Sequence, residues 1–334
     1  MNEEASTSNL IRGCWQLAAG HSQQNADLQP IMDAIACGFT TFDCADIYCG
    51  VEELLGRASQ EVPEIRLRIH TKCVPDLNCL HEVNYEYIER IIDRSLRRLR
   101  VDCLDLVQFH WWNFEIKNYL YALEFLSKLK DKGKIAEIGL TNVNGKYLEQ
   151  ILKNFNIAAL QVQISPFDRR VERGVGELCR KNHVKLLAYG SLLGGFISEK
   201  WLGNEEPVLE TLSNRSLIKY KLLIDAACGW TEFQRRLSII NALAVKYRTD
   251  IANIVIAALL QSGRADSVIV GLSPRNYAGQ NRSLMQFPIL EAKDLQEIST
   301  WPCNLFGDVY DEERDVDGAH AKVMKYNLNA ELTP

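Results

Sequence analysis

Residues 39–50 read FTTFDCADIYCG, an apolar, β-branched run that ends in two carboxylates, two cysteines and a tyrosine. Such a run is typical of a buried strand. Its end places Asp43, Asp46 and Tyr48 within six residues of one another. In a barrel of parallel strands, the polar residues directly after each strand collect at one edge, where active sites are built. The stretch therefore predicts a strand with a site at its carboxyl end.

Further apolar runs lie on both sides of this stretch and alternate with segments of helical period. One helical segment starts near Leu28 and ends at Gly38, and another carries apolar residues at three- and four-residue steps from Ile88 to Leu99. This alternation is typical of βα units around a parallel sheet. Eight strand candidates can be counted, at residues 11–16, 39–45, 66–72, 104–110, 135–141, 158–164, 184–190 and 267–271.

Eight strands separated by helices in a chain of 334 residues predict an α/β protein with a closed (β/α)8 TIM barrel. An open doubly wound sheet would need a Gly-rich phosphate turn, and neither GVGELC at residue 174 nor GLTNVNGKY at residue 139 fits one. Two irregular stretches remain, a long insertion before the last strand from about Leu192 to Trp230 and a polar C-terminal tail. We expect a single domain over residues 1–334, with a core at about 11–300 and the tail at 301–334.

The composition, 47% hydrophobic and 24% charged with a net charge of -5, is that of a globular protein with a full-sized core and argues against nucleic acid as a partner. No run of 18 apolar residues is present, and the acidic start MNEEASTSNL is unlike a signal peptide. We therefore expect a cytoplasmic protein without a membrane partner, as a monomer or a weak homo-oligomer. Ten cysteines without a CxxC pair favour free thiols over a disulfide frame or a metal site.

Four polar residues at predicted strand ends suit one task, the delivery of a proton to an oxygen that becomes negative. They are Asp43, Tyr48, Lys72 and His110. An unperturbed phenol, with a pKa of about 10, is too weak an acid at neutral pH. A neighbouring Lys72 would lower the pKa of Tyr48, and Asp43 would hold Lys72 in place. His110 would donate a hydrogen bond to the same substrate oxygen.

Each of these residues also has an ordinary structural explanation. A single Asp after a strand is often a helix N-cap, a lone Tyr a rim aromatic, and a lone His a satisfied core residue. We interpret Asp46 as such a loop or capping residue. The arginines at positions 94, 97, 98 and 100 are interpreted as a solvated helix face and not as an anion site. The joint arrangement of the four residues at neighbouring strand ends is what favours catalysis.

Six motifs, in order along the chain, resemble those of the aldo-keto reductase superfamily. DCADIY with Glu52 is similar to the family's Asp-x-Ala-x-x-Tyr motif, HTK to its lysine strand, and LDLVQFHWWN to its histidine strand. IGLTNVN, QVQ and AYGSLLGG resemble the segments that hold the nicotinamide. The resemblance runs from Gly13 to about Asn281. The segments 214–230 (NRSLIKYKLLIDAACGW) and 307–329 (GDVYDEERDVDGAHAKVMKYNLN) resemble a less-characterised branch of the superfamily.

The resemblance implies a reductase that passes hydride from NADP(H) to an aldehyde or a ketone, with Tyr48 as the general acid. It also implies that the cofactor lies across the barrel mouth without a Rossmann domain. Gly271 and Tyr277 stand where many members carry the Lys and Arg that hold the 2'-phosphate. Arg275 could still pair with that phosphate, which favours NADP(H) and leaves NAD(H) open. The expected cofactor contacts are Thr141, Asn142, Gln161, Tyr189, Leu192, Gly271, Ser273, Arg275 and Asn281.

The pocket for a small-molecule carbonyl substrate has three aromatic candidates near strand ends, Trp15, Trp111 and Trp112, for which packing is the alternative. The insertion and the tail are either lids or packing elements. A second hypothesis for the whole chain is a cofactor-binding regulatory or sensor protein on the same barrel, resembling the potassium-channel β subunits. A metal-dependent barrel hydrolase would need clustered ligands, and the chain has six histidines with only one placed at a strand end.

Overall fold

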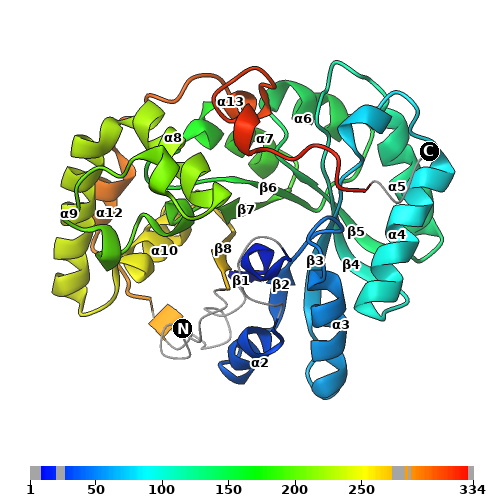
Figure 1. Cartoon of the computed structure of the whole chain (residues 1–334), viewed down its shortest axis with the longest axis horizontal. Coiled ribbons are helices and arrows are strands. Elements are labelled where there is room, and N and C mark those ends of the chain that lie inside the picture. The colour runs from blue at the N-terminus through cyan, green and yellow to red at the C-terminus, as the bar shows by residue number, and fades with distance from the viewer. Residues whose placement is uncertain (1–8, 20–26, 273–282, 285–286, 330–334) are drawn as a thin grey trace.

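The computed structural model describes residues 9–19, 27–272, 283–284 and 287–329. Its strands form a closed barrel in which every neighbouring pair is parallel and the strands follow one another in chain order. The last strand closes on the first, with Leu10 opposite Val268 and Gly13 opposite Gly271 (Figure 1). The predicted (β/α)8 fold is thus confirmed. The strands are β1 (Leu10–Gly13), β2 (Thr41–Asp43), β3 (Arg68–Cys73), β4 (Leu104–Phe109), β5 (Ile135–Thr141), β6 (Ala159–Gln163), β7 (Lys185–Tyr189) and β8 (Ser267–Gly271).

Helices surround the barrel on the outside (Figure 1). Those of the βα units are α2 (Gln29–Ala36), α3 (Val51–Glu61), α4 (Tyr85–Leu99), α5 (Tyr119–Asp131), α6 (Gly145–Leu152), α7 (Val175–Lys181) and α10 (Ile251–Gln261). The insertion contains α8 (Arg215–Ala227), which is followed by α9 (Gly229–Tyr247). After β8 come α12 (Ala292–Ser299) and, in the tail, α13 (Asp311–Arg314). Short 3-10 segments are η1 (Trp15–Leu17), η2 (Leu77–Cys79), η3 (Arg170–Arg173), η4 (Leu193–Gly195), η5 (Glu199–Trp201), η6 (Leu209–Thr211) and η7 (Ala321–Val323). No helix within the described ranges has both the length and the apolar character to cross a membrane.

The helix α4 shows how local sequence sets an element. Asn84 caps its start by accepting a hydrogen bond from the Tyr87 amide at 2.9 Å, and Arg100 ends it in the left-handed conformation. The apolar stripe that includes Ile88 and Ile91 is buried, as its period predicts. The prediction of a fully solvated arginine face is wrong for Arg94, which is buried. Its long side chain reaches inward from the helix to polar partners in the fold.

The insertion after β7 is more regular than the sequence suggested. It contains the helix α8, which Asn214 caps through the Leu217 amide at 2.9 Å. The apolar period of this helix is interrupted by Lys219 and Lys221, and both lysines are nevertheless buried. Because buried lysines are rare, a helix whose inner face carries two of them is hard to find by hydrophobic pattern alone.

The tail runs back along the barrel and is fastened at two points. Near its start, the α13 residue Glu313 forms a buried ion pair with Arg170, at 2.7 Å between Oε1 and Nη2. Near its end, the backbone amide of Asn329 donates to the carboxylate of Asp76, and the Asn329 side chain donates to the Val74 carbonyl at 2.6 Å. Figure 1 shows this segment, coloured red, passing from α13 toward the end near α4 and α5. The tail therefore belongs to the folded barrel and borders its mouth.

Candidate active site

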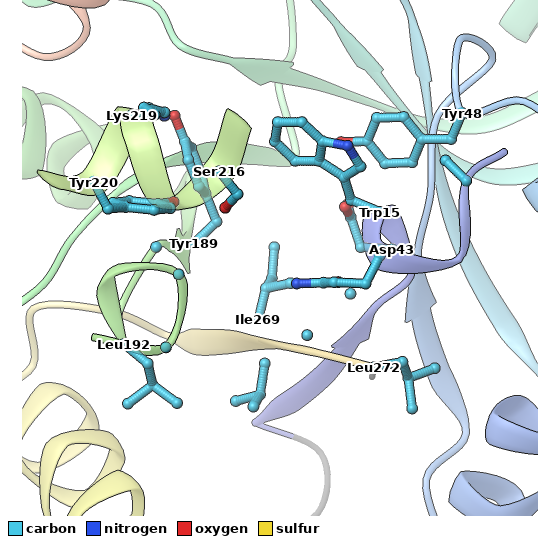
Figure 2. Close-up of a pocket in the computed structure, with 18 of the residues that line it drawn as sticks. Trp15, Asp43, Tyr48, Tyr189, Leu192, Ser216, Lys219, Tyr220, Ile269 and Leu272 are labelled. Atoms are coloured by element: carbon cyan, nitrogen blue, oxygen red, sulfur yellow. The ribbon is translucent and has the colours of Figure 1, made fainter. Parts of the chain in front are cut away.

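A cavity of about 890 Å³ lies at the mouth of the barrel, where the carboxyl ends of the strands meet (Figure 2). Its walls come from strand ends, from the insertion and from the tail. The structure brings together in this cavity the predicted residues Trp15, Asp43, Tyr48, Lys72, His110, Trp112, Thr141, Asn142, Gln161, Tyr189, Leu192 and Gly271. Ser273, Arg275 and Asn281 lie outside the described residues.

Lys72 lies between Asp43 and Tyr48 at the centre of the site. Its ammonium donates to Asp43 Oδ1 and to the Cys44 carbonyl, each at 2.7 Å. The same nitrogen lies 4.9 Å from the centre of the Tyr48 ring. Both ends of the Lys72–Asp43 pair are buried, and the extra hydrogen bond to a carbonyl offsets part of the cost of desolvating the two charges.

Two glutamines hold Asp43 in place. Gln108 and Gln161 each donate a side-chain hydrogen bond to Asp43 Oδ2, at 2.8 and 2.6 Å, and Gln161 also donates to Gln108 Oε1. The sequence did not identify Gln108 as a site residue, because Gln108 lies inside β4 and the site residues were expected mainly at strand ends. The available signal was a polar side chain within a buried apolar strand, which needs a partner.

Burial and charge act in opposite directions on the two central groups. For Lys72, burial lowers the pKa, but Asp43 and Tyr48 raise it more, so the net pKa lies above its ordinary value. For Tyr48, burial raises the pKa and outweighs the lowering by the Lys72 ammonium. Lys72 thus lowers the pKa of Tyr48, as expected, but the net pKa lies above the ordinary value of a tyrosine and not below it. Tyr48 is a protonated phenol beside a positive charge.

His110 follows β4 and lines the cavity. Burial, helped by the positive charges of Arg314 and Lys72, holds the pKa of His110 well below its ordinary value, so its imidazole is neutral at physiological pH. Its Nδ1 atom is buried and has no hydrogen-bond partner among the described residues. A neutral imidazole can donate one hydrogen bond, as the sequence interpretation requires of it.

The predicted nicotinamide contacts form one wall of the cavity. Asn142 has a left-handed backbone, with φ of 58°, and its side chain accepts a hydrogen bond from the Tyr189 hydroxyl at 2.9 Å. Arg12 and Ser191 also line the cavity and are buried, and Arg12 Nε, Arg12 Nη1 and Ser191 Oγ have no partner within the described part of the chain. Phosphate oxygens accept hydrogen bonds from such groups, so the donor set fits a dinucleotide.

The three tryptophans occupy different environments. Trp15 stacks on Tyr48 with ring centres 5.9 Å apart, and Trp112 lies 4.3 Å from the His110 ring, so both border the reacting groups. Trp111 does not line the cavity and is fully buried. Its indole nitrogen donates to the carbonyls of Asn113 and Ile116. These hydrogen bonds orient the indole ring away from the cavity and toward the core. For Trp111 the packing alternative replaces the predicted pocket role.

Several cavity residues were not identified individually from the sequence. They come from α8 and from the tail, the segments interpreted as lids or packing, and include Arg215, Ser216, Lys219, Tyr220, Tyr310 and Met324. The Tyr220 side chain packs closely on the loop after β7. A Cβ atom on Gly190 would lie 2.5 Å from the Tyr220 hydroxyl, and one on Gly194 would lie 2.6 Å from its ring. Gly190 and Gly194, two of the three glycines of AYGSLLGG, thus let α8 form a wall of the cavity. Figure 2 shows Lys219 and Tyr220 on this helix, across the cavity from Trp15 and Tyr48.

Asp46 lies in the loop between β2 and α3, as the sequence suggested, but its side chain caps none of the helices that the structure describes. It is buried next to the active-site strands, accepts a hydrogen bond from the Val74 amide at 3.3 Å and lies 3.8 Å from Arg94. Burial and the negative charge of Glu52 raise the pKa of Asp46 to about 7. The residue joins β3, α4 and the end of the tail.

Comparison with known proteins agrees with this geometry. The sequence model of the Aldo/keto reductase family matches residues 9–300. The chain is 32% identical over 201 residues to an NADP(+) aldo-keto reductase of Schizosaccharomyces pombe, covering 56% of this chain and 58% of that protein. It is 23% identical over 313 residues to the NADH-specific methylglyoxal reductase of Escherichia coli, covering 85% of this chain and 92% of that protein.

A solved structure has the same fold. It is a thermostable aldo-keto reductase in complex with the inhibitor epalrestat, with a TM-score of 0.66 and 23% identity over 87% of this chain and 94% of that one. At this identity the likeness shows the fold alone. The family match, which spans most of the sequence, shows more: the chain belongs to the aldo/keto reductase family.

Proposed function

We propose that this protein reduces an aldehyde or a ketone to an alcohol with NADPH or NADH, and that Tyr48 donates the proton. The observation that carries the proposal is the Lys72 ammonium, which bonds Asp43 at 2.7 Å and lies 4.9 Å from the Tyr48 ring in the cavity at the barrel mouth. Family membership supports the reaction class.

The cofactor, when bound, supplies the hydride. The chain's own part is to hold the reactants and to move a proton. Tyr48 is protonated before reaction because burial raises its pKa. As the carbonyl oxygen becomes negative, the phenol gives up its proton, and the Lys72 ammonium stabilises the phenolate that forms. Asp43 keeps that ammonium charged and in position.

His110 and the aromatic residues place the carbonyl. A neutral His110 donates a hydrogen bond to the carbonyl oxygen without taking the proton that Tyr48 delivers. Trp15 and Trp112 border the same space and exclude water from it. Thr141, Asn142, Gln161 and Tyr189 form the wall against which the nicotinamide would lie, as the family resemblance implies.

The cofactor is the first point to test. One relative is named for NADP(+) and another for NADH, so both forms are candidates, and the NADPH preference rests on the predicted role of Arg275. Titration of the protein with NADPH and NADH, followed by cofactor fluorescence, measures both affinities. The binding form is then used to screen aldehydes, ketones and quinones. We expect binding and turnover of at least one carbonyl class. Tight binding without turnover of any carbonyl would favour the sensor hypothesis instead.

A further inference from the structure

We propose that the physiological carbonyl substrate carries a carboxylate, and that Lys219 of α8 binds this group. The inference rests on the proposed function and names the substrate class for the same cavity. Lys219 lines the cavity and faces it from the side opposite Tyr48 (Figure 2). It belongs to the NRSLIKY segment of the insertion, which the proposed reaction does not otherwise use.

The charge of Lys219 is buried without a direct ion pair among the described residues. The residue is only 6% exposed, yet within the described ranges its ammonium has no ion pair and no hydrogen-bond acceptor. Its neighbours are three aromatic rings, with the nitrogen 5.1 Å from the centres of Tyr189 and Tyr220 and 5.6 Å from that of Tyr310. Aromatic faces stabilise a cation but offer weaker compensation for lost water than a carboxylate does.

The nearby carboxylates are already engaged by another cation. Arg170 donates to Asp168 from Nε and Nη2, at 2.9 and 2.7 Å, and to Glu313 from Nη1 and Nη2, at 3.0 and 2.7 Å. All three residues of this cluster are buried. Both carboxylates thus hydrogen-bond Arg170, and they act on Lys219 only through their charge. A carboxylate of the ligand would give the Lys219 ammonium the direct ion-pair partner that it lacks among the described residues.

Lys219 is close to the reacting groups. Tyr310, one of its three rings, lies 6.1 Å from the His110 ring, and Tyr189, another, bonds the Asn142 side chain. In the proposed binding mode, a carbonyl held between Tyr48 and His110 has its other end toward the aromatic rings that surround Lys219. A carboxylate carries the single negative charge that one ammonium can neutralise.

Burial lowers the pKa of Lys219 to about 8, so the side chain is still mostly charged at neutral pH. The bound carboxylate would raise that pKa again. A preference for anionic substrates should thus weaken as pH rises from 7 to 9, since a carboxylate stays ionised over this range. The charged and titratable groups that face Lys219 are Asp168, Arg170, Tyr189, Tyr220, Tyr310, Glu313 and His320.

The kinetic test compares 4-carboxybenzaldehyde with methyl 4-formylbenzoate, which differ in one negative charge. We expect the full-length enzyme to favour the acid in kcat/KM by ~10-fold or more, as a charged hydrogen bond implies. Lys219→Met should abolish the preference while turnover of the ester continues, and Lys219→Arg should keep it. Lys221→Met is the matched control, because Lys221 is also buried on α8 but is paired with Asp225 and Glu206. It should leave the preference unchanged.

A binding test separates this inference from the proposed reaction. Calorimetry with benzoate and methyl benzoate, on the enzyme loaded with oxidised cofactor, needs no turnover. We expect benzoate affinity to fall at least ~10-fold in Lys219→Met and to hold in Lys221→Met. Equal benzoate affinity in the wild type and Lys219→Met, or a wild type that treats acid and ester alike, overturns the inference while carbonyl reduction stands. Lys219-dependent benzoate binding without reduction of any carbonyl overturns the proposed function and leaves the anion site.

Discussion

The Lys72 ammonium is the single group on which the proposed proton transfer depends. We expect Lys72→Met to lower kcat for carbonyl reduction by about 10²-fold or more, because the phenolate of Tyr48 would form without a stabilising charge and Asp43 would be left unpaired. Steady-state kinetics with the best carbonyl substrate measures the change. Lys128→Met, on the exposed face of α5, is the control and should keep full activity. Wild-type kcat in Lys72→Met would remove Lys72 from the mechanism.

Asp46 should make the stability of the fold depend on pH. Its pKa is raised from 3.8 to about 7 in the folded state, so between these values the folded chain holds a proton that the unfolded chain releases. The free energy of unfolding must then fall as pH rises through this window. Asn does not titrate in this range, so the free energy of unfolding of Asp46→Asn should fall less between pH 4.5 and 7.5 than that of the wild type. We expect the two decreases to differ by about 1–3 kcal/mol.

Urea denaturation of both proteins at several pH values between 4.5 and 7.5 tests this prediction. Asp131→Asn, at the exposed end of α5, is the control and should follow the wild type. If Asp46→Asn instead tracks the wild-type pH dependence, Asp46 is already ionised in the folded state. In that case Arg94, 3.8 Å away, would be its effective ion-pair partner.

The strands and their order could be predicted from the sequence because each one is a short apolar run bounded by helical periods. The same logic placed Asp43, Lys72 and His110 at strand ends, where the structure has them around one cavity. Elements that bury charge were harder to predict. The helix α8 carries Lys219 and Lys221 on buried positions. No hydrophobic pattern reports that a lysine will be covered by tyrosines or paired with an acid such as Glu206, 15 residues away.

Side-chain direction was the other limit. Two adjacent tryptophans, Trp111 and Trp112, cannot both face the cavity, and the sequence does not tell which one does. The hydrogen bonds of the Trp111 indole to Asn113 and Ile116 decide it. Asn329, a partner of both Arg94 and Asp46, lies more than 200 positions from each of them in sequence. Contacts at that separation leave no local pattern.

The tail is held by the buried cluster around Arg170, which connects η3 to α13. Arg170→Met should destabilise the fold by roughly 3–5 kcal/mol, because Asp168 and Glu313 would stay buried without a counter-charge. Chemical denaturation measures this loss, and limited proteolysis should show faster cleavage within residues 303–329. Arg180→Met, exposed on α7, should change the stability by less than ~0.5 kcal/mol. A similar small change in Arg170→Met would mean that the cluster does not anchor the tail.

For the molecule as a whole, the barrel, the insertion and the tail have separable tasks. The closed barrel fixes Asp43, Lys72 and His110 on three successive strand ends, so the reacting groups depend on the most rigid part of the fold. The insertion and the tail add Lys219 and Tyr310 to the same cavity. In the proposed function, the reaction depends on residues of the barrel, and in the further inference the substrate preference depends on the insertion.

Isotope transfer from the cofactor is the most direct test of the central claim. Wild type and Tyr48→Phe are each mixed with an aldehyde and with cofactor that carries deuterium at the transferred position, and the alcohol is analysed by mass spectrometry over time. The account predicts one deuterium at the former carbonyl carbon in the wild type, and formation at least ~10²-fold slower in Tyr48→Phe with unchanged cofactor affinity. An alcohol without deuterium, or an undiminished rate in Tyr48→Phe, would contradict it.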